Sequence, residues 1–167
     1  MIGPTLDTAR LVLRPMTMAD YPAYFSFVSG TRTQYMNGPH DVATAWHVFC
    51  GDVAQWPLKG MGGLVITKDG VAVGTVGLCQ PPDFPEPELG WFLYDGAEGQ
   101  GIVIEAAAAL RDWGLGPRGL STMVSNIDPD NQRSIRVAGR LGSRIDPLAA
   151  TPGNGPTEVW RHVRRAA

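Results

Sequence analysis

The chain has 167 residues, of which 44% are hydrophobic and 18% are charged, and its formal net charge is −2. This composition predicts a single globular domain over residues 1–167 and does not favour a nucleic-acid or membrane-surface partner. No apolar run approaches the ~20 residues that a membrane helix needs, and the N-terminus lacks the pattern of a secretory signal, so we expect a cytoplasmic protein.

The first part of the chain predicts one strand followed by two helices. Charge and bulk alternate over 10–15, which is typical of a strand. Apolar residues at helical spacing predict a helix over 20–30, with Asp20 as its N-cap. A second helix is expected over 41–56, and Pro57 follows its expected end.

The remaining elements alternate between strands and helices. The pair Asp69-Gly70 between two strand-like runs predicts a β-hairpin over 64–76. After a proline-rich break, the patterns predict a buried strand over 88–94, a helix over 99–114, a strand over 120–126, a helix over 128–142 and a strand over 157–164. This order predicts the α/β (α+β) class, with a mixed, mostly antiparallel central sheet and helices on both faces.

The cysteines and histidines predict neither a disulfide nor a metal site. Cys50 and Cys79 form no C-x-x-C pair, and without a secretory signal we expect them to be reduced, buried thiols. His40, His47 and His162 are scattered along the chain and show no spacing typical of metal ligands.

The stretch D-G-A-E-G-Q-G-I-V-I-E (95–105) joins a predicted strand to a predicted helix. It departs from the dinucleotide fingerprint, because Ile104 stands at the third glycine position, and it lacks the G-K-[ST] triplet of a Walker loop. One interpretation is a tight turn without a ligand. The other is a phosphate site, because a helix start offers unpaired N–H groups and a positive dipole end, and glycines let an anion approach the backbone.

Three segments in this order resemble the GNAT N-acetyltransferases, and within them the type that acetylates N-terminal amines of ribosomal proteins. The segments are T-A-R-L-V-L-R-P, E-L-G-W-F-L-Y with E-G-Q-G-I-V-I-E-A, and N-Q-R-S-I-R-V-A-G-R-L-G. The resemblance covers about residues 5–165 and implies the GNAT-like acyl-CoA N-acyltransferase fold. It also implies direct transfer of an acetyl group from acetyl-CoA, the co-substrate, to a primary amine.

The resemblance further implies where acetyl-CoA binds. The strand over 88–94 should splay from its neighbour and offer main-chain groups to the pantetheine arm, and the N–H of Phe92 should polarise the thioester oxygen. The glycine loop should bind the diphosphate through its amides. The implied cofactor-binding residues are Phe92, Leu93, Tyr94, Glu98, Gly99, Gln100, Gly101, Ile102, Val103, Asn131 and Ser134.

The chain departs from the family pattern at several positions. Glu98 places a negative charge where Gln or Arg is usual, and Val103 adds bulk where Gly or Ala is usual. In many relatives a tyrosine in the late helix acts as the general acid, whereas Ala138 stands at that position here. Ser143 replaces the usual phenylalanine after Gly142.

Two residues are the main candidates for catalysis. Glu88 is the candidate base, directly or through water, with a structural salt bridge as the alternative; Glu86, in a proline-flanked turn, is a second candidate for the base. Ser134 is the candidate acid for the leaving thiolate, with Asn131 one helical turn before it to bind the pantetheine amide; helix capping by Asn131 is the alternative. Glu105 stands at a position that matches the family pattern. It either has a direct role in the site or complements the positive end of the helix dipole.

The acceptor stays open between protein N-terminal and small-molecule amines. An α-amine has a pKa of about 7.7–8.0 and a lysine amine one near 10.4, so an α-amine needs a weaker base. A non-catalytic acyl-CoA-binding or interaction module on the same fold is the alternative function. Relatives allow a monomer or a homodimer. The following residues either line the acceptor pocket or belong to the core: Tyr35, Met36, Trp46 and Trp91.

Overall fold

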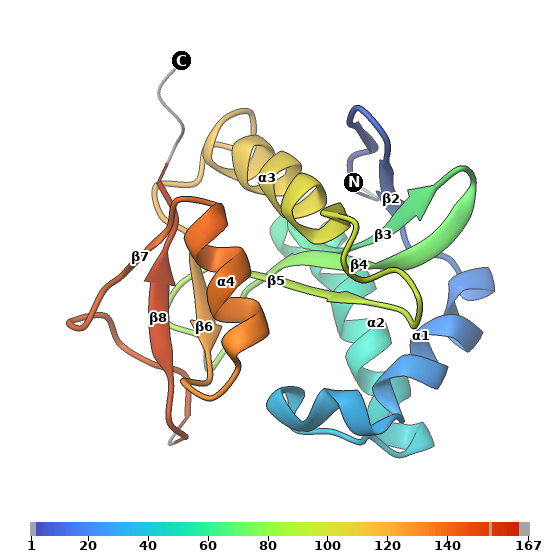
Figure 1. Cartoon of the computed structure of the whole chain (residues 1–167), viewed down its shortest axis with the longest axis horizontal. Helices are drawn as coiled ribbons and strands as arrows, with labels where there is room; N and C mark the ends of the chain where they lie inside the picture. Colours follow the sequence, from blue (N-terminus) through green and yellow to red (C-terminus); the bar gives the residue numbers. More distant parts are fainter. Residues whose placement is uncertain (1–2, 154, 164–167) are drawn as a thin grey trace.

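The computed structural model describes residues 3–153 and 155–163, whose course Figure 1 shows. The strands are β1 (Leu6–Asp7), β2 (Val12–Pro15), β3 (Gly62–Lys68), β4 (Val71–Cys79), β5 (Glu88–Leu93), β6 (Val124–Ile127), β7 (Arg144–Ile145) and β8 (Glu158–Arg161). The α-helices are α1 (Tyr21–Val28), α2 (Val42–Lys59), α3 (Ile102–Leu115) and α4 (Gln132–Arg140), and short 3-10 helices span Met18–Asp20 and Thr31–Met36.

The strands of the described residues form one mixed sheet in the order β1-β2-β3-β4-β5-β6-β8-β7. Each neighbouring pair is antiparallel except β5 and β6, which run parallel. A parallel pair needs a crossover connection, and α3 supplies it. The predicted fold class is confirmed.

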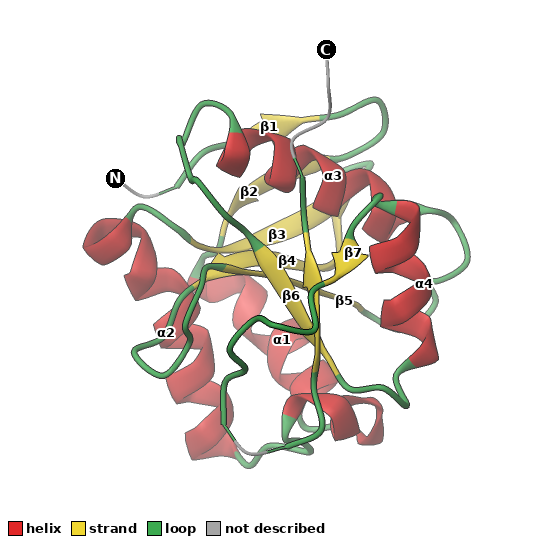
Figure 2. Ribbon diagram, turned by 90° about the vertical axis from the view of Figure 1, so that its left-hand side faces the viewer, coloured by secondary structure: helices red, strands yellow, loops and turns green. Residues whose placement is uncertain are grey.

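Helices cover both faces of the sheet, as Figure 2 shows for α3 on one side and α1 with α2 on the other. Successive residues of β3 point to opposite faces and so enter different clusters. Leu64 and Ile66 are buried with residues of α3, whereas Val65 is buried with Tyr24 and Phe49 from α1 and α2. Burial on both faces explains the nearly continuous apolar run of this strand.

One correction to an expected boundary concerns the end of α2. The helix continues through Pro57 to Lys59, and Gly60 ends it in the left-handed conformation at φ 67°. A proline inside a helix is costly. Here the last turn is held in place by Trp56, which is 2% exposed and donates its indole N–H to the Gly63 carbonyl at 2.9 Å. Tertiary packing therefore overrides the local stop signal.

Other boundaries moved by a few residues. The helix expected from Gly99 begins at Ile102, and the strand expected over 120–126 forms only at Val124–Ile127. The two-residue strands β1 and β7 are too short to show a periodic pattern and were not predicted. The last strand is Glu158–Arg161, and the predicted end at Arg164 lies outside the described residues.

The sequence predicted that Asp20 caps α1, but its side chain makes no capping hydrogen bond to the helix. Its carboxylate instead accepts from the Thr17 main-chain N–H and pairs with Arg14. Across 3–153 and 155–163, no helix is long and apolar enough to cross a bilayer.

Candidate active site

The parallel strands β5 and β6 meet at one end and diverge from there. Their Cα pairing within the described residues joins Glu88 to Val124 alone. At the same end, the Ser125 hydroxyl donates to the Leu89 carbonyl at 2.5 Å, and the N–H of Val124 donates to the Pro87 carbonyl at 3.0 Å. Beyond Leu89, β5 keeps an open edge toward β6. The splay that the sequence predicted is present.

The main-chain groups of β5 alternate in direction, which decides which of them face the open edge. The N–H of Tyr94 donates to a β4 carbonyl at 3.0 Å. Because directions alternate along an antiparallel strand, Phe92 also faces β4, and Trp91 and Leu93 face the open edge. The prediction that Phe92 and Tyr94 offer main-chain groups to pantetheine is therefore wrong, as is the Phe92 oxyanion donor. Leu93 stays a candidate, and Trp91 joins it.

The glycine loop between β5 and α3 presents free amides. Gly99 and Gly101 both adopt φ of 75°, a left-handed conformation that suits glycine. Within the described chain, no protein group accepts a hydrogen bond from the N–H groups of residues 99–104. A pocket of about 310 Å³ adjoins the loop and is lined in part by Gln100 and Ile102. The side chain of Ile102 is buried in the core, so only its main-chain N–H is available to a ligand.

Neither unusual residue of the loop closes this amide face. Val103 packs against the core cluster of α3. The carboxylate of Glu98 pairs with Arg32, which also pairs with Asp95. The Arg32 guanidinium lies 5.2 Å from the centre of the Phe27 ring, a cation–π contact that holds it in place. Arg32 thus compensates the charge of Glu98, and the sequence gave no signal for this long-range pairing.

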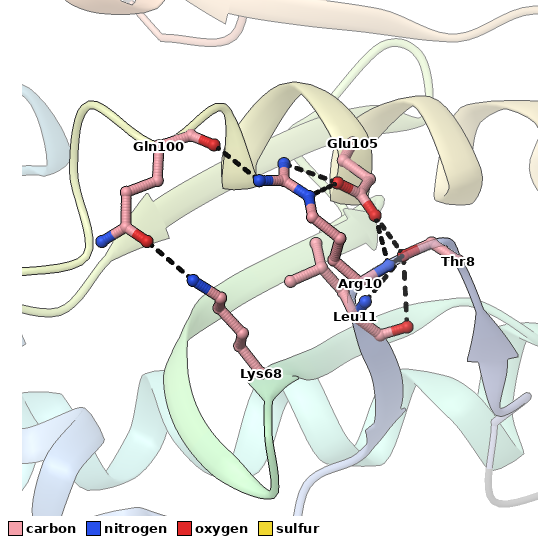
Figure 3. A network of polar contacts seen from close by, with 6 residues as sticks. All are labelled: Thr8, Arg10, Leu11, Lys68, Gln100 and Glu105. Atoms are coloured by element: carbon pink, nitrogen blue, oxygen red, sulfur yellow. Dashed lines mark hydrogen bonds and ion pairs between the residues drawn. The ribbon is translucent and has the colours of Figure 1, made fainter.

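A polar network fastens the start of α3 to the first two strands (Figure 3). Glu105 accepts from the Thr8 hydroxyl at 2.6 Å, from the Arg10 main-chain N–H at 2.9 Å and from Arg10 Nε at 2.8 Å. Arg10 also donates to the Gln100 carbonyl at 3.1 Å, and Lys68 donates to the Gln100 side chain at 2.9 Å. Glu105 therefore anchors the glycine loop, a role beyond the expected complementation of the helix dipole.

Replacing Glu105 by Gln should weaken this anchor by about 1–2 kcal/mol at pH 7, because charge-assisted hydrogen bonds are lost. Partial burial works to raise the pKa of Glu105, but the bonds from Thr8 and Arg10 outweigh it and lower the pKa from its ordinary 4.5. A lowered pKa stabilises the fold above 4.5, and this stabilisation is lost as the pH falls through the folded value. Urea unfolding should therefore separate the variant from the wild type at pH 7, and the difference should shrink as the pH falls through the folded pKa of Glu105.

Asp7→Asn is the matched control for this experiment. Asp7 is an exposed carboxylate in β1 without a hydrogen-bond partner in the described part of the chain, so its substitution should leave the unfolding midpoint unchanged. Equal stability of Glu105→Gln and the wild type at pH 7 would contradict the anchoring role.

Glu88 lies at the closed end of the cleft. Burial raises the pKa of its carboxyl to about 7, against a lowering by the hydrogen bond that Asn126 Nδ2 donates at 2.9 Å. Among the described residues no basic side chain pairs with Glu88, so the alternative of a structural salt bridge is not seen. A carboxyl that titrates near 7 suits a general base at neutral pH.

A second carboxyl with a raised pKa lies nearby and was not anticipated from the sequence. Burial raises the pKa of Asp52 on α2 to about 6. Its carboxylate accepts from the Tyr24 hydroxyl at 3.3 Å and from the Cys79 thiol at 3.5 Å, and Cys79 is the register partner of Glu88. Cys50 and Cys79 are free thiols, but both are half-buried rather than buried as the sequence predicted.

Asn131 and Ser134 lie at the start of α4. Asn131 Oδ1 accepts the main-chain N–H of Ser134 at 3.2 Å, so the capping alternative is observed. The Asn131 Nδ2 and the Ser134 hydroxyl make no hydrogen bond within the described residues, which leaves both groups available to a ligand. Their roles toward acetyl-CoA stay predictions.

The residues considered for the acceptor pocket have mixed surroundings. Trp46 meets Tyr21 edge-on with ring centres 5.3 Å apart, and Trp91 packs against the main core. Tyr35 donates from its hydroxyl to the Asp130 carbonyl at 3.3 Å, which connects the 3-10 helix Thr31–Met36 to the start of α4. Tyr35 is therefore placed close to the start of α4, where Asn131 and Ser134 lie.

The splayed strands, the free amides and the half-buried carboxyl of Glu88 are the features that the resemblance to acyl-CoA-dependent acyltransferases implied. Residues 10–144 match the acetyltransferase (GNAT) domain, so the chain belongs to the GNAT acetyltransferase family. GNAT acetyltransferases use acetyl-CoA as their co-substrate.

Solved structures support this assignment. An acetyltransferase from Agrobacterium tumefaciens is 45% identical, with a TM-score of 0.93 over 96% of this chain and 95% of that chain. A putative GNAT-family acetyltransferase from Bordetella pertussis is 25% identical, with a TM-score of 0.74 over 95% of this chain and 99% of that chain. A ribosomal-protein alpha-N-acetyltransferase in complex with coenzyme A is 16% identical, with a TM-score of 0.77 over 96% and 98% of the two chains, and shares the fold.

One curated protein is similar over a shorter stretch. The uncharacterised Bacillus subtilis protein YkkB is 40% identical over 55 residues, which are 33% of this chain and 32% of that protein. This match therefore spans about a third of the relative's length.

Proposed function

We propose that this chain transfers the acetyl group of acetyl-CoA to a primary amine. The observation that carries the proposal is Glu88, whose pKa is raised to about 7 at the closed end of a cleft between diverging strands. An amine attacks only through its free lone pair, and a base with this pKa takes up the released proton at neutral pH. The free amides of residues 99–104, which follow the other end of β5, support diphosphate binding at the same cleft.

In the proposed reaction the amine nitrogen attacks the thioester carbonyl carbon, so a C–N bond forms and the C–S bond breaks. Glu88 takes a proton from the nitrogen, directly or through water. The Ser134 hydroxyl gives a proton to the leaving thiolate and regains one from solvent. The main-chain N–H of Leu93 is the proposed donor to the thioester oxygen. Holding both reactants in one cleft supplies an effective molarity of about 10⁵–10⁸ M.

The proposed acceptor is an α-amine, of a protein N-terminus or of a small molecule. At pH 7 an α-amine of pKa about 7.7–8.0 is neutral in roughly one molecule in ten, whereas a lysine amine of pKa about 10.4 is neutral in roughly one in 2,500. A base with a pKa of about 7 therefore suits the α-amine better. The ribosomal-protein N-terminal type is the form of this proposal that the three sequence segments favour.

Two measurements on the whole chain test the proposal. Calorimetric titration with acetyl-CoA should show binding, and a thiol-release assay should show turnover with peptides that carry a free N-terminus. Matched peptides with a blocked N-terminus and an internal lysine should react more slowly at pH 7. If acetyl-CoA binds but no amine of a broad panel releases the thiol, the non-catalytic acyl-CoA-binding module replaces the enzyme.

Ser134→Ala should lower kcat by about 10²-fold and leave the Kd for coenzyme A unchanged, because a general acid typically contributes 10²–10⁴-fold. Ser134→Thr keeps a hydroxyl and should retain most of the activity. The cap at Asn131 uses the main-chain N–H of residue 134, which both variants retain. A merely structural cap thus predicts wild-type kcat for Ser134→Ala, and that result would exclude the acid role.

A further inference from the structure

An open space lies beside β5 on the side of the sheet that α1 and α2 cover. Gly63, Gly77 and Gly90 are register partners across β3, β4 and β5. A Cβ on Gly63 would meet Met16 at 2.7 Å, and one on Gly77 would meet Cys79 at 3.5 Å. A Cβ on Gly90 would meet no atom within 4 Å. Space for a ligand atom therefore exists next to Gly90, on the strand with the open edge.

Two polar side chains flank this space. Glu88 lies on the same face of β5 as Gly90, because residues two apart share a face. Asn126 follows Val124, the β6 partner of Glu88, by two residues and so lies on that face across the cleft. Asn126 Nδ2 donates to Glu88 Oε2 at 2.9 Å.

The contact between these side chains leaves one buried oxygen without a partner. Asn126 Oδ1 is buried and has no hydrogen-bond donor in the described structure. Glu88 accepts from Asn126 through both the side-chain Nδ2 and the main-chain N–H of that residue. A buried acceptor without a donor is rare and costly, so Asn126 Oδ1 calls for a donor from a ligand.

We propose that Asn126 is a positioning residue that orients Glu88 toward the space over Gly90 and binds one N–H of the acceptor amine there through its own Oδ1. This inference rests on the proposed function. A neutral primary amine has two N–H groups and one lone pair. One N–H bonds Glu88 Oε1, the other bonds Asn126 Oδ1, and the lone pair stays free for the thioester carbon. A secondary amine has one N–H and leaves one of these oxygens unbonded, so the pair selects primary amines.

The groups that face Glu88 define how its pH dependence is interpreted. Cys79 faces it from β4 and Asn126 from β6, while Asp52 of α2 contacts Cys79. Burial raises the pKa of the Cys79 thiol, which stays neutral at pH 7. Asp52 titrates at about 6, below Glu88 at about 7. Because burial raises the pKa of both carboxyls, the limb of a pH–rate profile near pH 7 is assigned to Glu88 by its loss in Glu88→Gln.

The test uses the full chain, an amine that the wild type accepts, and the N-methyl derivative of that amine. Asn126→Ala should lower kcat/KM for the primary amine by about 10- to 100-fold, the effect of losing a hydrogen bond to a charged group. It should bring the primary and N-methyl amines to similar rates. It should also move the acidic limb to higher pH, because one of the two donors that lower the pKa of Glu88, the Asn126 side chain, is gone. In a Glu88→Gln background, Asn126→Ala should lower kcat/KM by a smaller factor, since Asn126 acts in part through Glu88.

Ser125→Ala is the matched control, because it also removes a side-chain bond from β6 to β5, at the Leu89 carbonyl. It should leave both the acidic limb and the selectivity for primary amines in place. Four results for Asn126→Ala would each overturn the inference. They are an unmoved acidic limb, unchanged selectivity for primary amines, weaker binding of coenzyme A, and losses of kcat/KM that add up when the change is combined with Glu88→Gln.

A failure of the proposed function is distinguishable from a failure of this inference. If the wild type acetylates no amine, the proposed function fails, and thermal unfolding against pH still reports the contact between Asn126 and Glu88. Asn126→Ala should then move the range over which stability falls to higher pH. An unchanged range would overturn the inference independently of turnover.

Discussion

Glu88→Gln should lower kcat by about 10²- to 10⁴-fold, the usual contribution of a general base, and should remove the limb near pH 7 from the pH–rate profile. Gln keeps the size and one acceptor oxygen of the side chain, so the bond from Asn126 Nδ2 can persist and coenzyme A should bind with unchanged Kd. Initial rates of thiol release from pH 5 to pH 9 measure the effect. A variant that keeps the wild-type rate and limb would show that another group takes the proton.

The same substitution should stabilise the fold at alkaline pH. Burial raises the pKa of Glu88 from 4.5 to about 7, so the folded state binds this proton more tightly than the unfolded state does. The resulting stabilisation is complete below pH 4.5 and is lost as the pH rises to about 7, which leaves a buried charge at pH 8. Gln carries no charge, so the variant should gain on the order of 1–3 kcal/mol over the wild type at pH 8 relative to pH 5.

Glu86→Gln is the matched control for this stability measurement. Hydrogen bonding to Arg161 lowers the pKa of Glu86 to about 2, the opposite of Glu88. Its substitution should destabilise the protein at pH 8, although the two carboxyls are only two residues apart. If thermal unfolding shows that both variants change stability in the same direction at pH 8, the destabilising, desolvated charge assigned to Glu88 is wrong.

Gly99→Ala should weaken coenzyme A binding by about 10- to 100-fold. Gly99 adopts φ of 75°, where an alanine costs about 1 kcal/mol or more, and relaxing that strain rotates the neighbouring N–H groups away from a shared anion. An added Cβ would meet no protein atom within 4 Å, so the folded protein has room for it. A loss of binding would thus arise at the amide face rather than from a clash in the core.

Calorimetric titration with coenzyme A measures this loss, and Gly119→Ala serves as its control. Gly119 has φ of 78° and the same free space, but it follows α3 and lies outside the loop. Both variants should lose similar stability, and only the Gly99 variant should lose affinity. Pantetheine lacks the diphosphate and should compete equally with the wild type and with Gly99→Ala. Wild-type affinity of the Gly99 variant would show that the loop does not hold the diphosphate.

Many helices, strands and turns of this protein could be predicted from the sequence, because they depend on local interactions. The hairpin at Asp69-Gly70, the strand from Glu88, and the helices with regular apolar spacing formed close to the expected positions, because turn preferences and side-chain periodicity act over a few residues. The glycine loop is likewise a local feature, since positive φ at Gly99 and Gly101 depends mainly on the absence of a Cβ. Fold class and family therefore followed from the order of local patterns.

Long-range contacts settled the chemistry of the site. The pairing of β5 with β4 turned the main-chain groups of Phe92 away from the cleft and those of Trp91 and Leu93 toward it, because a strand alternates direction and the sequence does not specify its phase. The partners of Glu98 and Glu88 are Arg32 and Asn126, which lie far away in the chain. A pKa depends on burial and on such neighbours, so Glu88 acquires the properties of a base only once the sheet and its helices have assembled around it.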